Sequence, residues 1–173
     1  MFANRGASYA DDVRDAAPPP ALGPRGEGWV ALQGILLVAV AIVAVIGPPW
    51  PASVRGLSTV IAAAAAACGL VLAAAGSRRL GSALTPFPRP AASQTLRDDG
   101  VYRLVRHPIY GGVLLLSIGV TAWRSPWAVV PTALLALLFD RKRRREEAWL
   151  VEAYPGYQDY RRRVTHVFWP YVW

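Results

Sequence analysis

Four apolar runs divide the chain and predict its secondary structure. Residues 29–46 and 57–76 carry no charged side chain over 18 and 20 positions, close to the roughly 20 residues that a helix needs to cross a bilayer. Runs 108–123 and 126–139 are shorter, at 16 and 14 residues, and their length alone also fits buried helices of a soluble protein. We predict an all-α, polytopic membrane protein with four transmembrane helices.

Lysine and arginine residues are distributed unevenly around these runs. Only Arg55 and Arg124 lie in the loops that follow the first and third runs. The other 17 of the 19 basic residues precede the first run, separate the second from the third, or follow the fourth. Basic residues that flank membrane spans are retained in the cytoplasm. We therefore predict a multi-pass protein of the cell membrane with both termini in the cytoplasm.

Composition supports a membrane protein over a soluble domain. Hydrophobic residues make up 54% of the 173 residues, and the formal net charge is +8. Residues 1–27 mix acidic, basic and proline residues with too little apolar material for a core, which predicts a disordered tail and not a signal peptide. Cys68 is the only cysteine and lies within the second run, so we predict neither a disulfide nor a metal site. We expect membrane lipids and no nucleic acid as partners, and the sequence leaves the oligomeric state open.

Small residues and prolines indicate the roles of the first half. Residues 28–80 would form two N-terminal transmembrane helices. In the second of them, the alanines at 62–67 and Gly69 would let a neighbouring helix approach closely, so we assign it to scaffolding. The following segment, 77–107, contains three prolines between positions 84 and 90, which exclude a helix there and predict a shaped cytoplasmic loop.

Residues 81–173 would form a second unit of loop, helical hairpin and C-terminal segment. Only positions 124–125 separate the third and fourth runs, and so short a connection predicts an antiparallel hairpin. No helix breaker stands between the fourth run and residues 141–153, which are good helix formers. The fourth helix should therefore extend beyond the membrane surface until Pro155 ends it.

The stretch GVYRLVRHPIYGG, residues 100–112, brings polar and aromatic groups to the start of the third helix. Pro108 suits the first turn of a helix, which places His107 near its N-cap. The free N–H groups there favour an anion, and two arginines would reinforce the site, Arg103 and Arg106. Tyr110 could offer a flat face to an adenine ring or another planar group. The same residues also fit an interfacial belt that anchors a span.

A second group of candidates follows the fourth run. The basic residues of RKRRREE, 141–147, are explained as a topology signal, but Glu146 and Glu147 are not. If the hairpin is tight, these carboxylates share a face with the loop of His107, where they suit ribose hydroxyls or an amino group. Tyr157 and Tyr160 then return the chain towards the membrane, where the terminal aromatic residues also fit an interfacial anchor.

These segments resemble a known family. GVYRLVRHPIYGG, the short hairpin and RRREEAWLVEAYPGYQDYRRRV look like the isoprenylcysteine carboxyl methyltransferases, within the wider group of integral-membrane methyltransferases that includes phospholipid N-methyltransferases. The resemblance covers residues 81–170. It implies that S-adenosylmethionine binds in a cytoplasmic-facing pocket formed by the last two spans and the C-terminal segment, and that a lipophilic methyl acceptor arrives from the bilayer.

The resemblance also assigns residues. Cofactor-binding positions would be Tyr102, Arg103, His107, Pro108, Tyr110, Glu146, Glu147, Tyr157 and Tyr160. Arg163 falls where the family places an arginine near the acceptor. The chain departs from the family at His166 and Val167, where members often carry a proline or a basic residue.

Methyl transfer requires alignment and exclusion of water more than acid or base catalysis. A carboxylate acceptor, such as that of a prenylated cysteine, is already ionised, and Arg106 or Arg163 could orient it. An amine acceptor would need a base, for which Glu147 or His107 is the nearest candidate. We favour O-methylation, with Arg106, Glu147 and Arg163 as catalytic candidates. Two alternatives are an NADPH-dependent membrane reductase of the sterol-reductase type and a non-enzymatic lipid-binding adaptor.

Overall fold

A computed structural model describes residues 18–90 and 95–170, and over these ranges the regular elements are all helical. The α-helices are α2 (Glu27–Ile46), α3 (Ala52–Leu80), α4 (Pro108–Arg124), α5 (Val129–Ala153) and α6 (Tyr157–Arg163). Three short 3₁₀ turns are η1 (Gly81–Ala83), η2 (Gly100–Arg103) and η3 (Pro126–Ala128). The predicted all-α class is confirmed for the described ranges. Most of the predicted disordered tail, residues 1–17, lies outside them.

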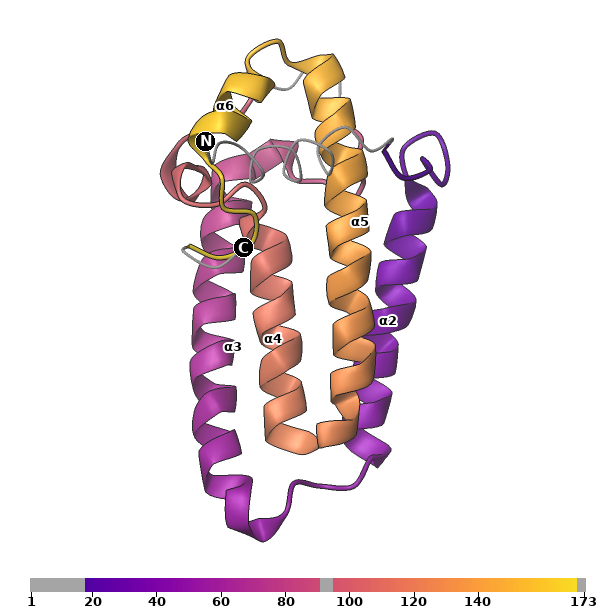
Figure 1. Ribbon diagram of the computed structural model, residues 1–173, viewed down its shortest axis with the longest axis vertical. Coiled ribbons are helices and arrows are strands. Elements are labelled where there is room, and N and C mark those ends of the chain that lie inside the picture. The colour runs from indigo at the N-terminus through magenta and orange to yellow at the C-terminus, as the bar shows by residue number, and fades with distance from the viewer. Residues whose placement is uncertain (1–17, 91–94, 171–173) are drawn as a thin grey trace, which may run out of the picture.

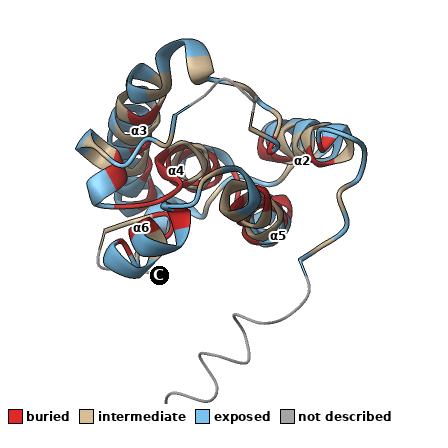
Figure 2. Ribbon diagram, turned by 90° about the horizontal axis from the view of Figure 1, so that it is seen from above, coloured by how far each residue is buried: buried red, intermediate tan, exposed pale blue. Residues whose placement is uncertain are grey.

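The four long helices run up and down beside one another. Helix α3 packs along α4, and α2 packs along α5 (Figures 1 and 2). The α2–α3 loop and the α4–α5 turn lie at one end of the molecule (Figure 1). Helix α6, the C-terminal part of α5 and the connection from α3 to α4 lie at the other end. The predicted antiparallel hairpin is confirmed, and the candidate site residues belong to segments that meet at this second end.

Small residues bring α3 and α4 into backbone contact. A Cβ atom on Gly112 would lie 2.7 Å from the backbone nitrogen of Ala73, and one on Gly69 would lie 2.8 Å from the Gly112 carbonyl oxygen. Both distances are too short for side-chain carbon, so the two helices approach closely only because both positions are glycine. The predicted scaffold packing of the second helix is confirmed.

Hydrogen bonds hold the end of the hairpin that lies away from the site. The hydroxyls of Thr121 on α4 and Thr132 on α5 lie 2.9 Å apart. The Ser125 hydroxyl donates to the Pro48 carbonyl at 2.7 Å, and the indole N–H of Trp50 donates to the Thr121 carbonyl at 3.0 Å. The first bond joins α4 to α5, and the other two join the α2–α3 loop to the last turns of α4 and to the α4–α5 turn.

Two element boundaries bear on the site. Helix α5 continues to Ala153, as predicted, and carries its charged half beyond the apolar part. The predicted loop starts later than position 77, because α3 continues to Leu80 and η1 follows it. Residues 84–90 contain no helix, as their prolines predict.

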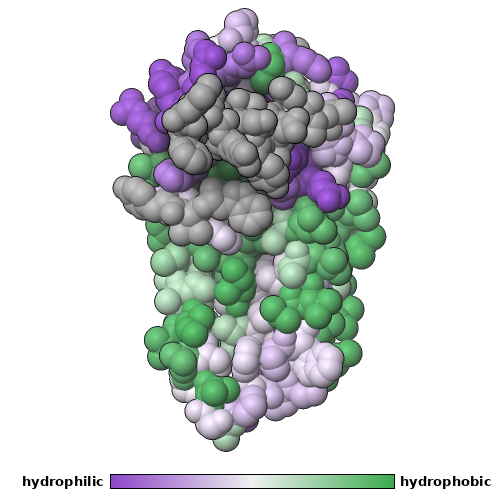
Figure 3. Space-filling model, viewed as in Figure 1, coloured by the Kyte–Doolittle hydropathy of each residue, from purple (hydrophilic) through white to green (hydrophobic). Residues whose placement is uncertain are grey.

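The outer surface of the helices is strongly apolar. Figure 3 shows hydrophobic side chains over the helical part of this face and hydrophilic ones at the end formed by α6 and the C-terminal part of α5. By length and composition, two segments could each cross a membrane, α2 and Ala52–Ala83. Helix α4 has 17 residues and α5 is charged beyond Phe139, so the crossing of a membrane by all four helices stays a prediction.

Candidate active site

The beginning of α4 is held by the C-terminal segment. Pro108 is the first residue of α4 and His107 is its N-cap, as predicted. The backbone N–H groups of Arg106 and His107 donate to the carbonyls of His166 and Val167, at 3.1 and 2.8 Å. His166 and Val167, where the sequence departs from the family, therefore contribute main-chain atoms to this pairing. The pairing fixes the direction in which the Arg106 and His107 side chains leave the backbone.

Glu147 is the centre of a buried polar network. Its Oε1 accepts a hydrogen bond from Arg106 Nε at 3.0 Å and lies 3.1 Å from His107 Nε2. The Glu147 side chain is only 5% exposed. Burial alone would raise the pKa of Glu147, but the hydrogen bond with His107 and the neighbouring positive charges lower it to about 2. Glu147 is therefore a carboxylate at neutral pH, and so low a pKa makes it a weak base.

Arg106 is also committed within this network. Besides Glu147, its guanidinium donates to the carbonyls of Val164 and Thr165, at 2.7 and 2.9 Å. These carbonyls lie just after α6, so one side chain joins the beginning of α4, the middle of α5 and the C-terminal segment. Arg106 thus has a structural role as a clamp among three segments.

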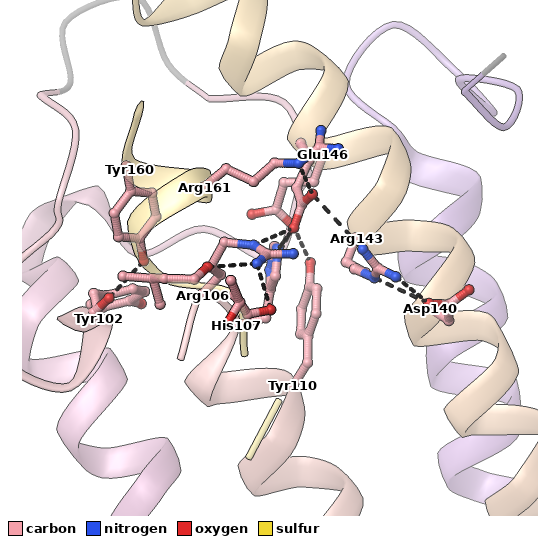
Figure 4. Close-up of polar contacts among 12 residues, drawn as sticks. Tyr102, Arg106, His107, Tyr110, Asp140, Arg143, Glu146, Tyr160 and Arg161 are labelled. Atoms are coloured by element: carbon pink, nitrogen blue, oxygen red, sulfur yellow. Dashed lines mark hydrogen bonds and ion pairs between the residues drawn. The ribbon is translucent and has the colours of Figure 1, made fainter. Parts of the chain in front are cut away.

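Glu146 faces a different direction from Glu147. Its Oε2 accepts a 2.6 Å hydrogen bond from the Tyr110 hydroxyl, and its side chain remains 24% exposed. The Tyr110 ring is stacked between those of His107 and Phe139, with centroid distances of 5.4 and 4.8 Å. Figure 4 shows Tyr110 reaching up to Glu146 beside His107 and Arg106. Ring stacking with His107 and Phe139 and the hydrogen bond to Glu146 therefore hold the Tyr110 side chain in one orientation.

A cavity of about 460 Å³ lies at this end of the molecule. Its wall combines the end of α3, the loop after it, the beginning of α4, one face of α5, and α6, with Gln33 from α2. Eight residues expected from the sequence line it: Tyr102, Arg106, His107, Pro108, Tyr110, Glu146, Tyr157 and Tyr160. The volume falls within the roughly 300–1,000 Å³ of small-molecule pockets.

Three further residues expected at the site are not among the lining residues. Glu147 is buried in the network with Arg106, behind the cavity wall. Arg103 is exposed at the end of η2. Arg163 is exposed on α6, where its guanidinium pairs with Asp98 at 3.0 Å. The structure therefore brings neither Arg103 nor Arg163 to the cavity.

Tyrosines form the wall beneath α6. The Tyr160 hydroxyl donates to the backbone carbonyl of Tyr102 at 2.8 Å, which joins α6 to η2. Tyr157 is packed beside Tyr160 with ring centroids 5.6 Å apart. Burial raises the pKa of both α6 tyrosines, and the nearby carboxylates raise that of Tyr157 further. The wall is therefore neutral and supplies aromatic surface together with hydroxyl groups.

Lys142 was missed by sequence reasoning. It lines the cavity although it is only 1% exposed to solvent, and its ammonium donates to Gln33 Oε1 at 2.7 Å and to the Pro86 carbonyl at 3.2 Å. The sequence pattern explains the whole basic run as a topology signal. Helical spacing could have singled it out, because residues four apart share a helix face and Lys142 precedes Glu146 by four.

Comparison with known proteins identifies a family. Residues 57–156, more than half of the chain, match the family described as phospholipid methyltransferase. The chain is also similar to the cobalt-zinc-cadmium resistance protein CzcN of Cupriavidus metallidurans, with 36% identity over 80 residues that make up 45% of this chain. The chain covers 37% of the length of that relative. The family match favours neither the reductase nor the adaptor. The chain belongs to the phospholipid methyltransferase family of integral-membrane methyltransferases, which includes the isoprenylcysteine carboxyl methyltransferases.

Proposed function

We propose that the protein binds S-adenosylmethionine in this cavity and transfers its methyl group to the carboxylate of a lipophilic acceptor, such as a prenylated cysteine. One observation carries the proposal. Residues that the family resemblance assigns to the cofactor, from positions 102–110, 146 and 157–160, are far apart in the sequence but line one cavity.

The residues present fit the cofactor. Glu146 accepts one hydrogen bond from Tyr110, and a carboxylate has further acceptor sites for ribose hydroxyls or an amino group. Tyr157 and Tyr160 supply flat surface and hydroxyl groups for a planar base. We expect Glu146, His107 and the tyrosines to hold the cofactor.

When bound, S-adenosylmethionine supplies a methyl group activated by a positively charged sulfur. The residues of this chain then position the acceptor and exclude water. Glu147, with a pKa of about 2, is a weak base at neutral pH, and it does not line the cavity. An acceptor that needs no deprotonation suits this site, which supports a carboxylate over an amine.

We further propose that all four long helices cross the membrane and that the cavity and both termini face the cytoplasm. Val130, Leu134 and Leu137 of α5 are about half exposed, and a bilayer would cover them. Trp123 and Trp127 at the α4–α5 turn are exposed, as expected of an interfacial belt. Single cysteines introduced at the turn and at the exposed end of α6, in a Cys68→Ala background, should react with an impermeant reagent from opposite sides of the membrane. Labelling from one side would refute this topology.

The binding step is tested by calorimetry of S-adenosylmethionine with the purified protein in detergent. Glu146→Gln should weaken binding about tenfold or more, because a charge-assisted hydrogen bond is lost. Glu152→Gln is the matched control, since Glu152 is exposed on the same helix and does not line the cavity. Absence of binding to the unchanged protein would refute the proposed function.

The acceptor is tested with radiolabelled cofactor and extracted membrane lipids. A methyl ester releases methanol on alkaline treatment, whereas an N-methyl group stays attached. We expect labelled methanol. If the label resists alkali, the protein is still a methyltransferase, but the proposal that its acceptor is a carboxylate is wrong.

A further inference from the structure

Lys142 is a buried cation whose hydrogen-bond partners among the described residues are neutral. Gln33 and Pro86 each supply an oxygen, and no carboxylate in the described ranges forms an ion pair with the ammonium. The neighbouring carboxylate of Asp140 is already paired with Arg143 and Arg144. A buried charge with no opposite charge in direct contact is costly to maintain. An anion placed in the cavity would therefore be bound strongly.

The other candidate cations are less suited to this task. Arg106 is already occupied by Glu147 and two main-chain carbonyls. Arg163 lies outside the cavity, paired with Asp98. Arg97 also lines the cavity but is exposed, so water screens its charge. Among the described cations that line the cavity, Lys142 is thus the buried one whose charge is not already paired with a carboxylate.

We infer that Lys142 binds a carboxylate group of a ligand in the cavity, the role that sequence reasoning gave to Arg106 or Arg163. This inference rests on the proposed function, since S-adenosylmethionine and the proposed acceptor each carry a carboxylate. Gln33 and Pro86 take two of the three N–H donors of the ammonium. The ammonium also lies 5.1 Å from the centre of the Tyr110 ring, and a ligand carboxylate would take its third donor. Because α2 supplies Gln33, the first helix takes part in orienting this lysine.

Burial supports the same assignment from a second direction. The pKa of Lys142 is lowered to about 8, mainly by burial, while the charge of Glu146 opposes the decrease. The ammonium form therefore still prevails at neutral pH. A ligand carboxylate at hydrogen-bond distance would add to the attraction of Glu146 and stabilise the ammonium further.

The test uses the protein in detergent together with three variants. Lys142→Met removes the charge at similar length, and Lys142→Arg retains it. Arg141→Met is the matched control, because Arg141 precedes Lys142 but is exposed and does not line the cavity. Thermal unfolding of each variant verifies that it is folded.

Two ligand pairs identify which carboxylate is bound. The first pair is S-adenosylmethionine and its decarboxylated analogue. The second is a prenylated cysteine with a free carboxyl group and its carboxamide, each measured as a competitor of methyl transfer. In each pair, the preference is the ratio of the affinity for the acid to the affinity for its analogue without a carboxylate. For one pair, Lys142→Met should reduce this ratio about ten- to hundredfold, and Lys142→Arg should restore part of it.

The pair that responds identifies the source of the carboxylate. If Lys142→Met behaves like Arg141→Met with both pairs, the inference is overturned although the proposed function stands. If the unchanged protein binds neither S-adenosylmethionine nor its analogue, the proposed function fails, and the assignment of Lys142 fails with it.

Discussion

Replacement of Glu147 by glutamine separates the buried network from the cavity. The change keeps the size of the side chain but removes its negative charge. In the unchanged protein, Glu147 Oε1 lies 3.0 Å from Arg106 Nε and 3.1 Å from His107 Nε2. Because Glu147 does not line the cavity, we predict a loss of stability first and a loss of ligand affinity only through displaced neighbours. The family resemblance, which places Glu147 among the cofactor-binding positions, implies the reverse order.

The magnitude follows from the pKa of Glu147. Its decrease from 4.5 to about 2 corresponds to about 3 kcal/mol of folding stability at neutral pH. Removal of one partner from a buried ion pair costs a similar amount, about 3–5 kcal/mol. Since the pKa is lower in the folded state, this stability is present above pH 4.5 and is lost as the pH falls towards 2. The difference in the free energy of unfolding between the unchanged protein and the variant should become smaller over the same pH range.

The assay is unfolding of both proteins in detergent at pH 7 and at several values below pH 4.5. Glu146→Gln serves as the comparison, because Glu146 is partly exposed and faces the cavity. We expect Glu147→Gln to lower stability at pH 7 by about 3 kcal/mol and Glu146→Gln to affect binding more than stability. A Glu147→Gln protein as stable as the unchanged one at pH 7 would refute the reasoning.

Three more predictions concern packing and pH. Gly112→Ala should destabilise the protein by about 1–3 kcal/mol, because its Cβ would meet the α3 backbone; Gly34→Ala, which meets nothing within 4 Å, should be neutral in the same unfolding assay. Thr132→Val should cost about 1 kcal/mol through the lost bond to Thr121, measured by the same unfolding, and an unchanged midpoint would contradict it. Binding of the carboxylate ligand should weaken as the pH rises above about 8, where Lys142 loses its proton; calorimetry that shows constant affinity up to pH ~10 would count against it.

Much of the fold could be predicted because it depends on local patterns. The short connection at positions 124–125 requires the hairpin, and uninterrupted helix formers carry α5 to Ala153. Proline at position 108 places the beginning of α4. The glycines and alanines of α3 indicate a close helix contact, although the sequence does not say that α4 is the partner. Each of these features follows from a few neighbouring residues.

The site was harder to predict because it depends on which way adjacent side chains point. Glu146 and Glu147 are sequence neighbours, yet one faces the cavity and the other the buried network. Successive residues on a helix are rotated by about 100°, and only the packing of α5 shows which direction is inward. The direction of the Arg163 side chain is equally hard to predict, because its position on α6 places it beside Asp98.

The position of the cavity depends on contacts between distant segments. Four main-chain carbonyls of residues 164–167 accept hydrogen bonds from Arg106 and His107, and carbonyl groups leave no signature in the sequence. The hairpin alone therefore lacks most of the acceptors that orient these two side chains. Since the C-terminal segment and Glu147 meet these requirements away from the cavity, Glu146 and Lys142 on the neighbouring face of α5 remain available for a ligand. We therefore expect stability and ligand binding to depend on different faces of α5, so that substitutions one residue apart separate them.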